Sequence, residues 1–336
     1  MFTRILVPLD GSTRAEKAIP AAARIARASG GSVILLRVAT APVDTGKYST
    51  TSAYVEEAVD ADLDEATSYL KNIAESGELA GITTEVKTFI GAVAPTILSA
   101  AQSFHANLIV MCSHGYTGFQ RWVLGSVADK VTHHSPIPVL VLREGGPVPA
   151  TAVHEPVHVL VPLDGSTLSE AVLEPAAHLA AALAQSTSQE GALHLLRVVD
   201  LPTSGGKFKS DAHIDTGLKE QVKHEDEAYL TTLENRLSER DLAYLNLSVT
   251  CSVEADPDVA EAIVKKAEQN GFDFIAMATH GRGGLQHWIL GSITERVLGA
   301  TKLPLLIVQP EAEKFKRASN GGETSQAPIQ IKSTLV

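Results

Sequence analysis

The residues of this sequence with the clearest chemical potential are glycines and a serine spaced as in an anion-binding site. Gly115 is followed by nine residues and then by Gly125 and Ser126, where an amphipathic helix is predicted to begin. The first amides of a helix lack partners within it and lie at the positive end of its dipole, so they can bind phosphate without lysine. Glycines also let the backbone approach phosphate oxygens closely. A tight turn with a serine cap that binds nothing has the same spacing, and spacing alone leaves both interpretations open.

The same spacing returns later in the chain, from Gly281 across nine residues to Gly291 and Ser292. Here Arg282 follows the first glycine, where the earlier segment has Tyr116. A guanidinium can pair with a phosphate through two parallel hydrogen bonds. We therefore expect tighter phosphate binding in the second segment, weakened by Arg282→Ala and less affected by Tyr116→Ala in calorimetric titrations. The alternative is that Arg282 is a solvated loop charge.

Further polar candidates follow short apolar runs that are predicted to be strands. Asp10 lies in Pro8-Leu9-Asp10-Gly11-Ser12, and Asp164 lies in the matching segment that begins at Pro162. These carboxylates could accept hydrogen bonds from ribose hydroxyls, or they could simply cap the following turn. Val38 and Val198 end the second apolar run of each half.

The elements that must position these residues alternate between strands and helices. Continuously apolar runs such as Leu108–Met111 are typical of strands that are covered on both faces. Such alternation predicts a doubly wound parallel sheet, which binds ligands beyond the carboxyl ends of its strands where the winding reverses. In the first half the predicted strands are 4–9, 33–39, 84–90, 107–112 and 138–142, and the predicted helices are 14–29, 56–77, 94–104 and 126–135.

The chain of 336 residues repeats itself. The shared segments keep their order, and the offset between them grows only from 154 to 166, so a domain-sized unit has been duplicated. We expect an α/β protein with two tandem five-stranded domains, 1–144 and 156–311, joined by a linker of residues 145–155. Residues 40–55 and 200–217 are predicted to be mobile loops, and the polar tail 312–336 is predicted to be disordered.

Composition limits the partners and the location. The net charge of −11 argues against nucleic acid or an anionic membrane surface as the main partner. The two cysteines share no metal-type spacing, and the N-terminus has no secretory apolar segment. We expect a cytoplasmic protein. The sequence shows neither a Ser-His-Asp set nor a pair of carboxylates placed for acid–base catalysis. A slow ATPase is therefore the most enzymatic activity that we expect.

Taken together, these motifs resemble those of a tandem universal stress protein, over nearly the whole chain except the linker and the tail. The family's motif is glycine, two residues, glycine, nine residues, and a glycine followed by serine or threonine. It is matched from Cys112 to Ser126 and from Ala278 to Ser292. The resemblance implies an adenine-nucleotide alpha-hydrolase-like, Rossmann-like fold that binds ATP. It further implies that Asp10 and Asp164 contact the nucleoside beside Pro8 and Pro162, and that the backbones of Val38 and Val198 read the adenine. The phosphates would be held by Gly115, Gly125, Ser126, Gly281, Gly291 and Ser292.

This sequence departs from the family motif at its first glycine, which is replaced by Cys112 in one copy and by Ala278 in the other. If the position requires a positive φ or a very close approach of the backbone, each Cβ costs about 1 kcal/mol or more. If it requires only a small residue, nothing is lost. We expect that binding is retained.

The expected function is that of an ATP-binding, nucleotide-sensing regulator in the stress response. The alternatives are a nucleotide-free dimeric scaffold and a slow ATPase that uses Mg²⁺. The fifth strands, 138–142 and 304–308, are apolar and would lie at sheet edges, which favours pairing of the two edges within one chain. Homodimerisation of the whole chain is left open.

Overall fold

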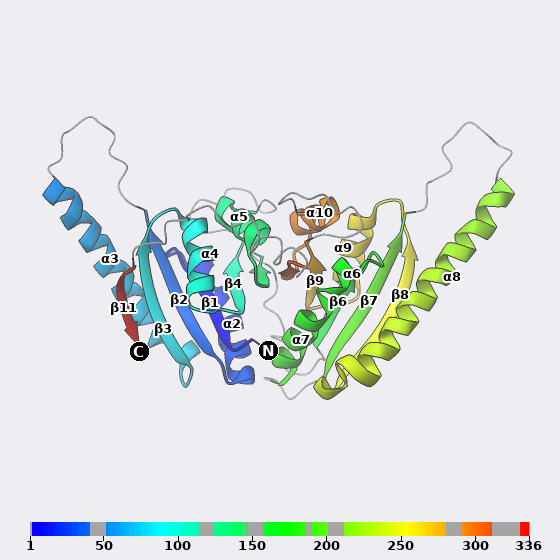
Figure 1. The fold of residues 1–336 in the computed structure, drawn as a ribbon, viewed down its shortest axis with the longest axis horizontal. Helices are drawn as coiled ribbons and strands as arrows, with labels where there is room; N and C mark the ends of the chain where they lie inside the picture. The colour runs from blue at the N-terminus through cyan, green and yellow to red at the C-terminus, as the bar shows by residue number, and fades with distance from the viewer. Residues whose placement is uncertain are drawn as a thin grey trace. The chain divides into compact units, whose positions relative to one another are not determined.

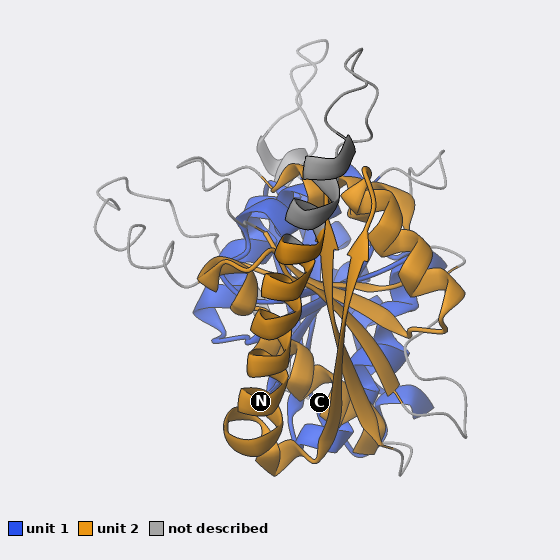
Figure 2. Cartoon of the chain, turned by 90° about the vertical axis from the view of Figure 1, so that its right-hand side faces the viewer, with its two compact units in different colours: residues 1–144, 316–336 blue, residues 145–315 orange. Residues whose placement is uncertain are grey.

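The computed structural model divides the chain into two units. It describes residues 2–40, 52–113, 124–143, 146, 157–185, 190–200, 212–279, 290–310 and 330–335. Unit 1 contains Met1–Glu144 together with Lys316–Val336, and unit 2 contains Gly145–Phe315 (Figure 2). The predicted linker lies outside the described residues except for Gly146. Within the described residues, no helix combines the length and the apolar character that crossing a membrane requires.

Unit 1 alternates strands and helices as the sequence predicts, and its strand bounds agree with the prediction to within one residue. Its strands are β1 (Arg4–Pro8), β2 (Ser32–Ala39), β3 (Thr83–Ile90), β4 (Leu108–Cys112), β5 (Val139–Leu142) and β11 (Gln330–Leu335). Its helices are α1 (Thr13–Glu16), α2 (Ala18–Ser29), α3 (Ser52–Ala74), the short η1 (Gly77–Leu79), α4 (Val93–Ser103) and α5 (Ser126–His134).

Unit 2 repeats this series of elements. Its strands are β6 (Val157–Pro162), β7 (Gly191–Val199), β8 (Leu247–Ala255), β9 (Phe274–Ala278) and β10 (Leu305–Val308). Its helices are α6 (Thr167–Glu170), α7 (Leu173–Gln185), α8 (Ala212–Arg236), η2 (Leu237–Asp241), η3 (Ala243–Leu245), α9 (Val259–Gln269) and α10 (Ser292–Ala300).

The five repeated strands of each unit form a parallel sheet. In unit 1 the order is β3-β2-β1-β4-β5, and in unit 2 it is β8-β7-β6-β9-β10. The winding therefore reverses between β1 and β4, and between β6 and β9, which confirms the predicted fold class (Figure 1).

Helices cover both faces of the unit 1 sheet. Ile34 and Leu36 of β2 pack with residues of α4 and α5 in one apolar cluster. The alternate residues Val33 and Leu35 are equally buried on the other face, where α2 and α3 contact the sheet. Residues buried on both faces explain why the strands read as continuous apolar runs.

The first predicted helix, 14–29, is divided into α1 and α2 at Lys17. Pro20 accounts for the break, because a proline has no N–H and its ring clashes with the carbonyl four residues earlier. The second copy has the same break between α6 and α7, and Pro175 lies at the matching place in α7.

Two expectations for polar segments were wrong in part. α3 begins at Ser52 and α8 at Ala212, inside the predicted loops 40–55 and 200–217; residues 41–51 and 201–211 lie outside the described residues. Within the tail that was expected to be disordered, β11 forms and pairs antiparallel with β3 (Figure 1). An edge strand offers unpaired backbone groups, and pairing with β11 satisfies them on β3.

Candidate nucleotide-binding cavity

A cavity of about 490 Å³ lies in unit 1 at the carboxyl ends of β1, β2 and β4. Its walls come from the turn after β1, the last residues of β2, one side of α3, the start of α4 and the start of α5. The cavity therefore lies at the reversal of the strand order, where a doubly wound sheet is expected to bind its ligand.

The cavity brings together most of the residues that the sequence predicted for unit 1. The predicted residues that line it are Pro8, Asp10, Val38, Cys112, Gly125 and Ser126. Gly115 lies outside the described residues. Residues from four separate parts of the chain thus face one volume large enough for a small ligand.

The turn after β1 is ordered by Asp10. Its Oδ1 accepts hydrogen bonds from the Ser12 amide at 2.9 Å and from the Ser12 hydroxyl at 2.6 Å. The Ser12 hydroxyl oxygen in turn accepts a hydrogen bond from the Ala15 amide and caps α1. Asp164 and Ser166 repeat this arrangement in unit 2 with the same two distances. Both carboxylates therefore order a turn, which was one of the two roles that the sequence allowed.

Val38 presents backbone groups to the cavity because β1 ends before β2 does. The Leu9 amide donates to the Leu36 carbonyl at 2.8 Å, whereas the Gly91 amide donates to the Ala39 carbonyl at 3.0 Å. Even-numbered residues of β2 therefore direct their amide and carbonyl groups toward β1, and odd-numbered residues toward β3. Val38 lies beyond the last paired residue of β1. Its polar backbone groups face the space that β1 leaves.

Val198 has the same relation to β6 in unit 2. The Leu163 amide donates to the Leu196 carbonyl at 2.8 Å, and the Asp256 amide donates to the Val199 carbonyl at 3.1 Å. β6 pairs with β7 only as far as Leu196. The two copies thus share an open backbone edge at the same position.

The start of α5 has amides that could bind an anion. The Gly125 amide is used to close the preceding loop, because it donates to the Ser113 carbonyl at 2.8 Å. The first bond within the helix runs from the Asp129 amide to the Gly125 carbonyl. Ser126, Val127 and Ala128 lie between these two amides and line the cavity, and their own amides precede the first helical bond. Ser126 therefore stands at the positive end of the helix dipole, as predicted.

The start of α10 repeats this closure in unit 2. The Gly291 amide donates to the Thr279 carbonyl at 2.7 Å, and the Glu295 amide donates to the Gly291 carbonyl at 2.9 Å. A Cβ atom on Gly291 would lie 3.0 Å from the Thr279 carbonyl oxygen. Close approach of the backbone, rather than a positive φ, explains the glycine, whose φ is −56°.

The structure settles one of the two possible requirements for the missing first glycine, a positive φ. Cys112 is the last residue of β4, and Ala278 is the last residue of β9. Among the described residues that are not glycine, only His105 and Asn246 have a positive φ. The position therefore requires no left-handed backbone, and the Cβ atoms at 112 and 278 cause no backbone strain.

In unit 2 the predicted residues lie at the ends of β6, β7 and β9 and at the start of α10, beside the reversal of the strand order. These residues are Pro162, Asp164, Val198, Ala278, Gly291 and Ser292. Gly281, Arg282 and Tyr116 lie outside the described residues. The expectation that the second copy holds phosphate more tightly through Arg282 stays a prediction.

Sequence reasoning found Asp10 but missed the other charged residues that line the cavity. Asp62 and Glu65 line it from α3, and Arg37 lines it from β2. No motif marks Asp62 and Glu65 in the sequence. Acidic residues on a long helix usually belong to a solvated surface, so these two did not stand out. A signal did exist for Arg37, since the segment Leu-Leu-Arg-Val recurs at 35–38 and 195–198.

The thiol of Cys251 on β8 is held in its neutral form. Burial, together with a hydrogen bond from Sγ to Glu234 Oε2 at 3.0 Å, raises the pKa of Cys251 to about 11. We expect iodoacetamide to label this thiol slowly at pH 8, where roughly one molecule in a thousand carries the reactive thiolate. Labelling followed by mass spectrometry should accelerate up to about pH 11. Glu234→Gln should speed labelling at pH 8, and a rate that levels off below pH 9 would contradict this assignment.

Comparison with known proteins identifies the family. The profile of the universal stress protein family matches residues 1–143 and 157–309. Universal stress protein YxiE of Bacillus subtilis is 32% identical over 148 residues, which are 43% of this chain and 100% of the Bacillus protein. A universal stress protein of Methanocaldococcus jannaschii is 30% identical over 146 residues, which are 43% of this chain and 84% of that protein.

A solved structure shows the same fold across both units. The crystal structure of a universal stress protein from Archaeoglobus fulgidus superposes with a TM-score of 0.60 at 23% sequence identity, covering 91% of this chain and 98% of that chain. The family profile matches each of the two copies and, together, most of the sequence. The chain therefore belongs to the universal stress protein family and contains two of its domains.

Proposed function

We propose that this protein binds adenine nucleotides, with ATP as the main ligand, and acts as a nucleotide-sensing regulator in the stress response. The observation that carries the proposal is the cavity at the strand-order reversal of unit 1. Its walls combine an open backbone edge at Val38, a carboxylate at Asp10 and the amides at the start of α5. Each feature matches a different part of a nucleotide.

The Val38 backbone offers both a donor and an acceptor, as the edge of an adenine requires. A carboxylate accepts several hydrogen bonds, so Asp10 can order its own turn and also bind a ribose hydroxyl. The amides of Ser126, Val127 and Ala128 would hold phosphate oxygens at the positive end of the helix dipole. The apolar side chains of Val93, Ile97 and Met111 would exclude water from the base.

Magnesium would enter with the nucleotide. Within the described residues, no three His, Cys, Asp or Glu side chains are grouped to hold a metal ion. Mg²⁺ usually binds through one or two carboxylates together with the phosphates of its ligand, so ATP could bring it to Asp10 without a dedicated protein site. The slow ATPase remains the alternative activity, with Mg²⁺ neutralising charge on the phosphates.

A regulatory role requires that ATP bind two states of the protein unequally. The nucleotide would contact α3, because Asp62 and Glu65 line the cavity, and α3 also packs on β2 and β3. A shift of α3 on binding would alter the surface offered to a partner protein. We further propose that the outer edges of β5 and β10 pair within one chain.

The test is to purify the protein without added nucleotide, release any bound ligand by heating, and identify it by chromatography. Equilibrium dialysis against ATP, ADP, AMP and adenosine then gives the affinities, and a phosphate-release assay measures hydrolysis. We expect an adenine nucleotide to bind in the micromolar range or more tightly. If no adenine nucleotide binds at millimolar concentration, the protein is a nucleotide-free scaffold; rapid phosphate release would make it an enzyme.

A further inference from the structure

β2 and β7 share the segment Leu-Leu-Arg-Val one residue before their ends, but the arginines of the two copies have different surroundings. Arg37 and Arg197 occupy the same position in Leu-Leu-Arg-Val, next to Val38 and Val198. Each lies one residue before the open backbone edge of its strand. The two units can therefore be compared directly at this position.

In unit 2 the arginine is paired with a carboxylate. Arg197 Nε lies 3.1 Å from Asp226 Oδ2 on α8, and both side chains are mostly buried, with exposed fractions of 11% and 13%. These two atoms do not meet the geometry of a hydrogen bond, so the contact between Arg197 and Asp226 is an ion pair. Arg197 also donates from Nη1 to the Leu163 carbonyl at 3.3 Å. The guanidinium thus ties α8 to β7 and to the turn after β6.

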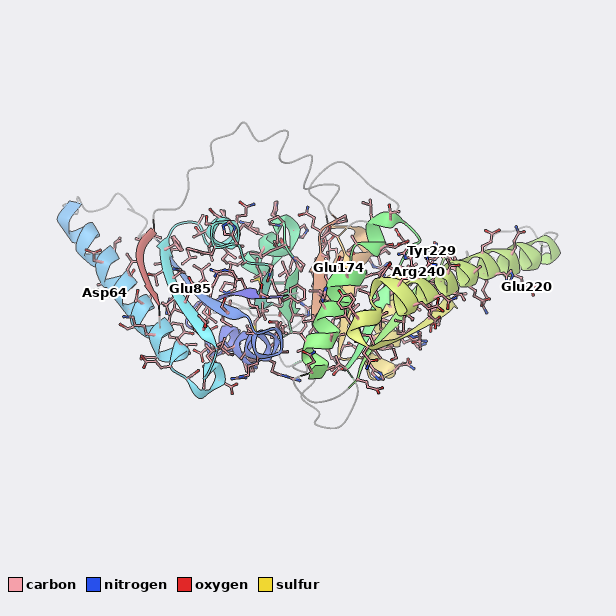
Figure 3. The ribbon with its side chains drawn as sticks, turned by 60° about the horizontal axis from the view of Figure 1, so that its bottom comes forward. Asp64, Glu85, Glu174, Glu220, Tyr229 and Arg240 are labelled. Atoms are coloured by element: carbon pink, nitrogen blue, oxygen red, sulfur yellow. The ribbon has the colours of Figure 1, made fainter. Side chains whose placement is uncertain are left out.

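The helices that pack on these arginines can be aligned through a shared tyrosine. Tyr69 on α3 donates to Glu16, and Tyr229 on α8, labelled in Figure 3, donates to Glu170, both at 2.9 Å. Burial, strengthened by these hydrogen bonds, raises the pKa of each tyrosine above its ordinary value, so both remain donors. Three residues before Tyr229 is Asp226, whereas three residues before Tyr69 is Ala66.

In unit 1 the arginine therefore lacks that carboxylate and lies in the wall of the cavity. Its guanidinium carbon is 5.1 Å from the centre of the Tyr69 ring. A Cβ atom on Gly11, whose φ is +86°, would lie 2.9 Å from Nη1, so the guanidinium packs against the turn after β1. In the part of the chain that the structure describes, Arg37 forms no salt bridge. β1 pairs directly with β4, and the chain continues from β4 to the start of α5.

The charges of the cavity make this arginine important for an anionic ligand. Among the described residues that line the cavity, Arg37 is the only Lys or Arg, and it is accompanied by the carboxylates of Asp10, Asp62 and Glu65. Three carboxylates repel a phosphate group, and the amides of α5 carry only partial charge. A full positive charge in the wall would offset part of that repulsion.

We propose that Arg37 is the cation in the cavity wall whose charge favours the phosphate groups of a nucleotide bound in unit 1, and that the matching Arg197 has a structural role. The inference rests on the proposed function, because it assigns the group that recognises the charge of that ligand. The proposal gives the two copies different roles for this arginine: Arg37 acts on the ligand, whereas Arg197 forms an ion pair with Asp226.

The test compares ATP with adenosine, which shares the nucleoside but has no phosphate. Calorimetric titrations use the full chain carrying Ser292→Asp, which places a negative charge at the start of α10 and confines ATP binding to unit 1. Arg37→Met should weaken ATP binding about tenfold, since a full positive charge in the cavity wall is lost, and should change adenosine binding less than about threefold. Arg37→Lys should restore most of the ATP affinity.

The matched control is Arg197→Met, titrated in a chain that carries Ser126→Asp so that only unit 2 binds ATP. It should lower the unfolding temperature and leave the ratio of ATP to adenosine affinity unchanged. Equal losses for ATP and adenosine with Arg37→Met, or a loss with Arg37→Lys as large as with Arg37→Met, would overturn the inference. Unchanged ATP affinity with Arg37→Met would do the same while leaving nucleotide binding in place. If the unsubstituted protein binds neither ligand, the proposed function itself fails.

Discussion

Replacing Ser126 with Asp should remove ATP binding from unit 1 without destabilising the protein. Ser126 is the first residue of α5 and lines the cavity. A carboxylate at the start of a helix interacts favourably with the helix dipole, so the fold should tolerate the change. The same carboxylate would stand where a phosphate is expected. Repulsion between this carboxylate and a phosphate in direct contact with it costs several kcal/mol, so the affinity for ATP should fall about a hundredfold or more.

The second unit provides a matched experiment, because Ser292 begins α10 as Ser126 begins α5. Ser292→Asp should close only unit 2, and the double variant should bind no ATP. Calorimetry should therefore report two sites in the unsubstituted chain, one in each single variant and none in the double variant. Thermal unfolding followed by circular dichroism should give a midpoint equal to or above that of the unsubstituted protein.

Ser126→Ala separates charge from loss of the hydroxyl. It keeps the amides of α5 and removes one donor, so it should weaken ATP binding about tenfold at most. If Ser126→Asp and Ser292→Asp leave both sites intact, phosphate is not held at these helix starts, and the central element of the proposed function is wrong. A lowered unfolding midpoint would instead show that the two serines are needed by the fold.

The sequence was sufficient to predict the parts of the fold that follow from local pattern. The repeat and the apolar runs gave the strands of unit 1, and the placement of Asp10, Val38 and Ser126 followed because parallel strands end at one edge of their sheet. Pro20 is a local signal as well, because a proline near the start of α2 accounts for the break between α1 and α2.

What the sequence could not provide were contacts between residues far apart in the chain. The different surroundings of Arg37 and Arg197 depend on one residue of the helix that packs on each strand, about 30 residues later in the chain. This residue is Ala66 in α3 and Asp226 in α8. The role of Gly125 also required the structure, because its amide closes a loop onto Ser113. Spacing marks such a glycine without saying which of its atoms is used.

The outer edge of β5 gives the second large effect that we expect. The Ile109 amide donates to the Pro138 carbonyl at 3.0 Å, and the Ser113 amide donates to the Leu142 carbonyl at 2.8 Å. Even-numbered residues of β5 therefore direct their backbone groups toward β4, and odd-numbered residues direct theirs toward the outer edge. Leu140 and Val141 are both fully buried, so a proline at either meets similar packing.

This alternation turns two neighbouring substitutions into a test of whether the β5 and β10 edges pair. Leu140→Pro removes a hydrogen bond to β4 in every case. Val141→Pro removes one only if another strand lies along the outer edge, because proline is tolerated where the missing N–H faces no partner. If the two units pair through this edge, each variant should lose about 3 kcal/mol, from the lost bond and the unpaired acceptor that it leaves.

Unit 2 allows the same comparison on the other side of the proposed pairing. The Ile275 amide donates to the Pro304 carbonyl and the Thr279 amide to the Val308 carbonyl, so Leu306 faces β9 and Ile307 faces the outer edge of β10. Urea unfolding should give similar losses for Leu306→Pro and Ile307→Pro. A loss for Ile307→Pro that is smaller than for Leu306→Pro by more than about 1 kcal/mol, the size of one net hydrogen bond, would show that this edge has no strand beside it. The two units would then have to be joined in some other way.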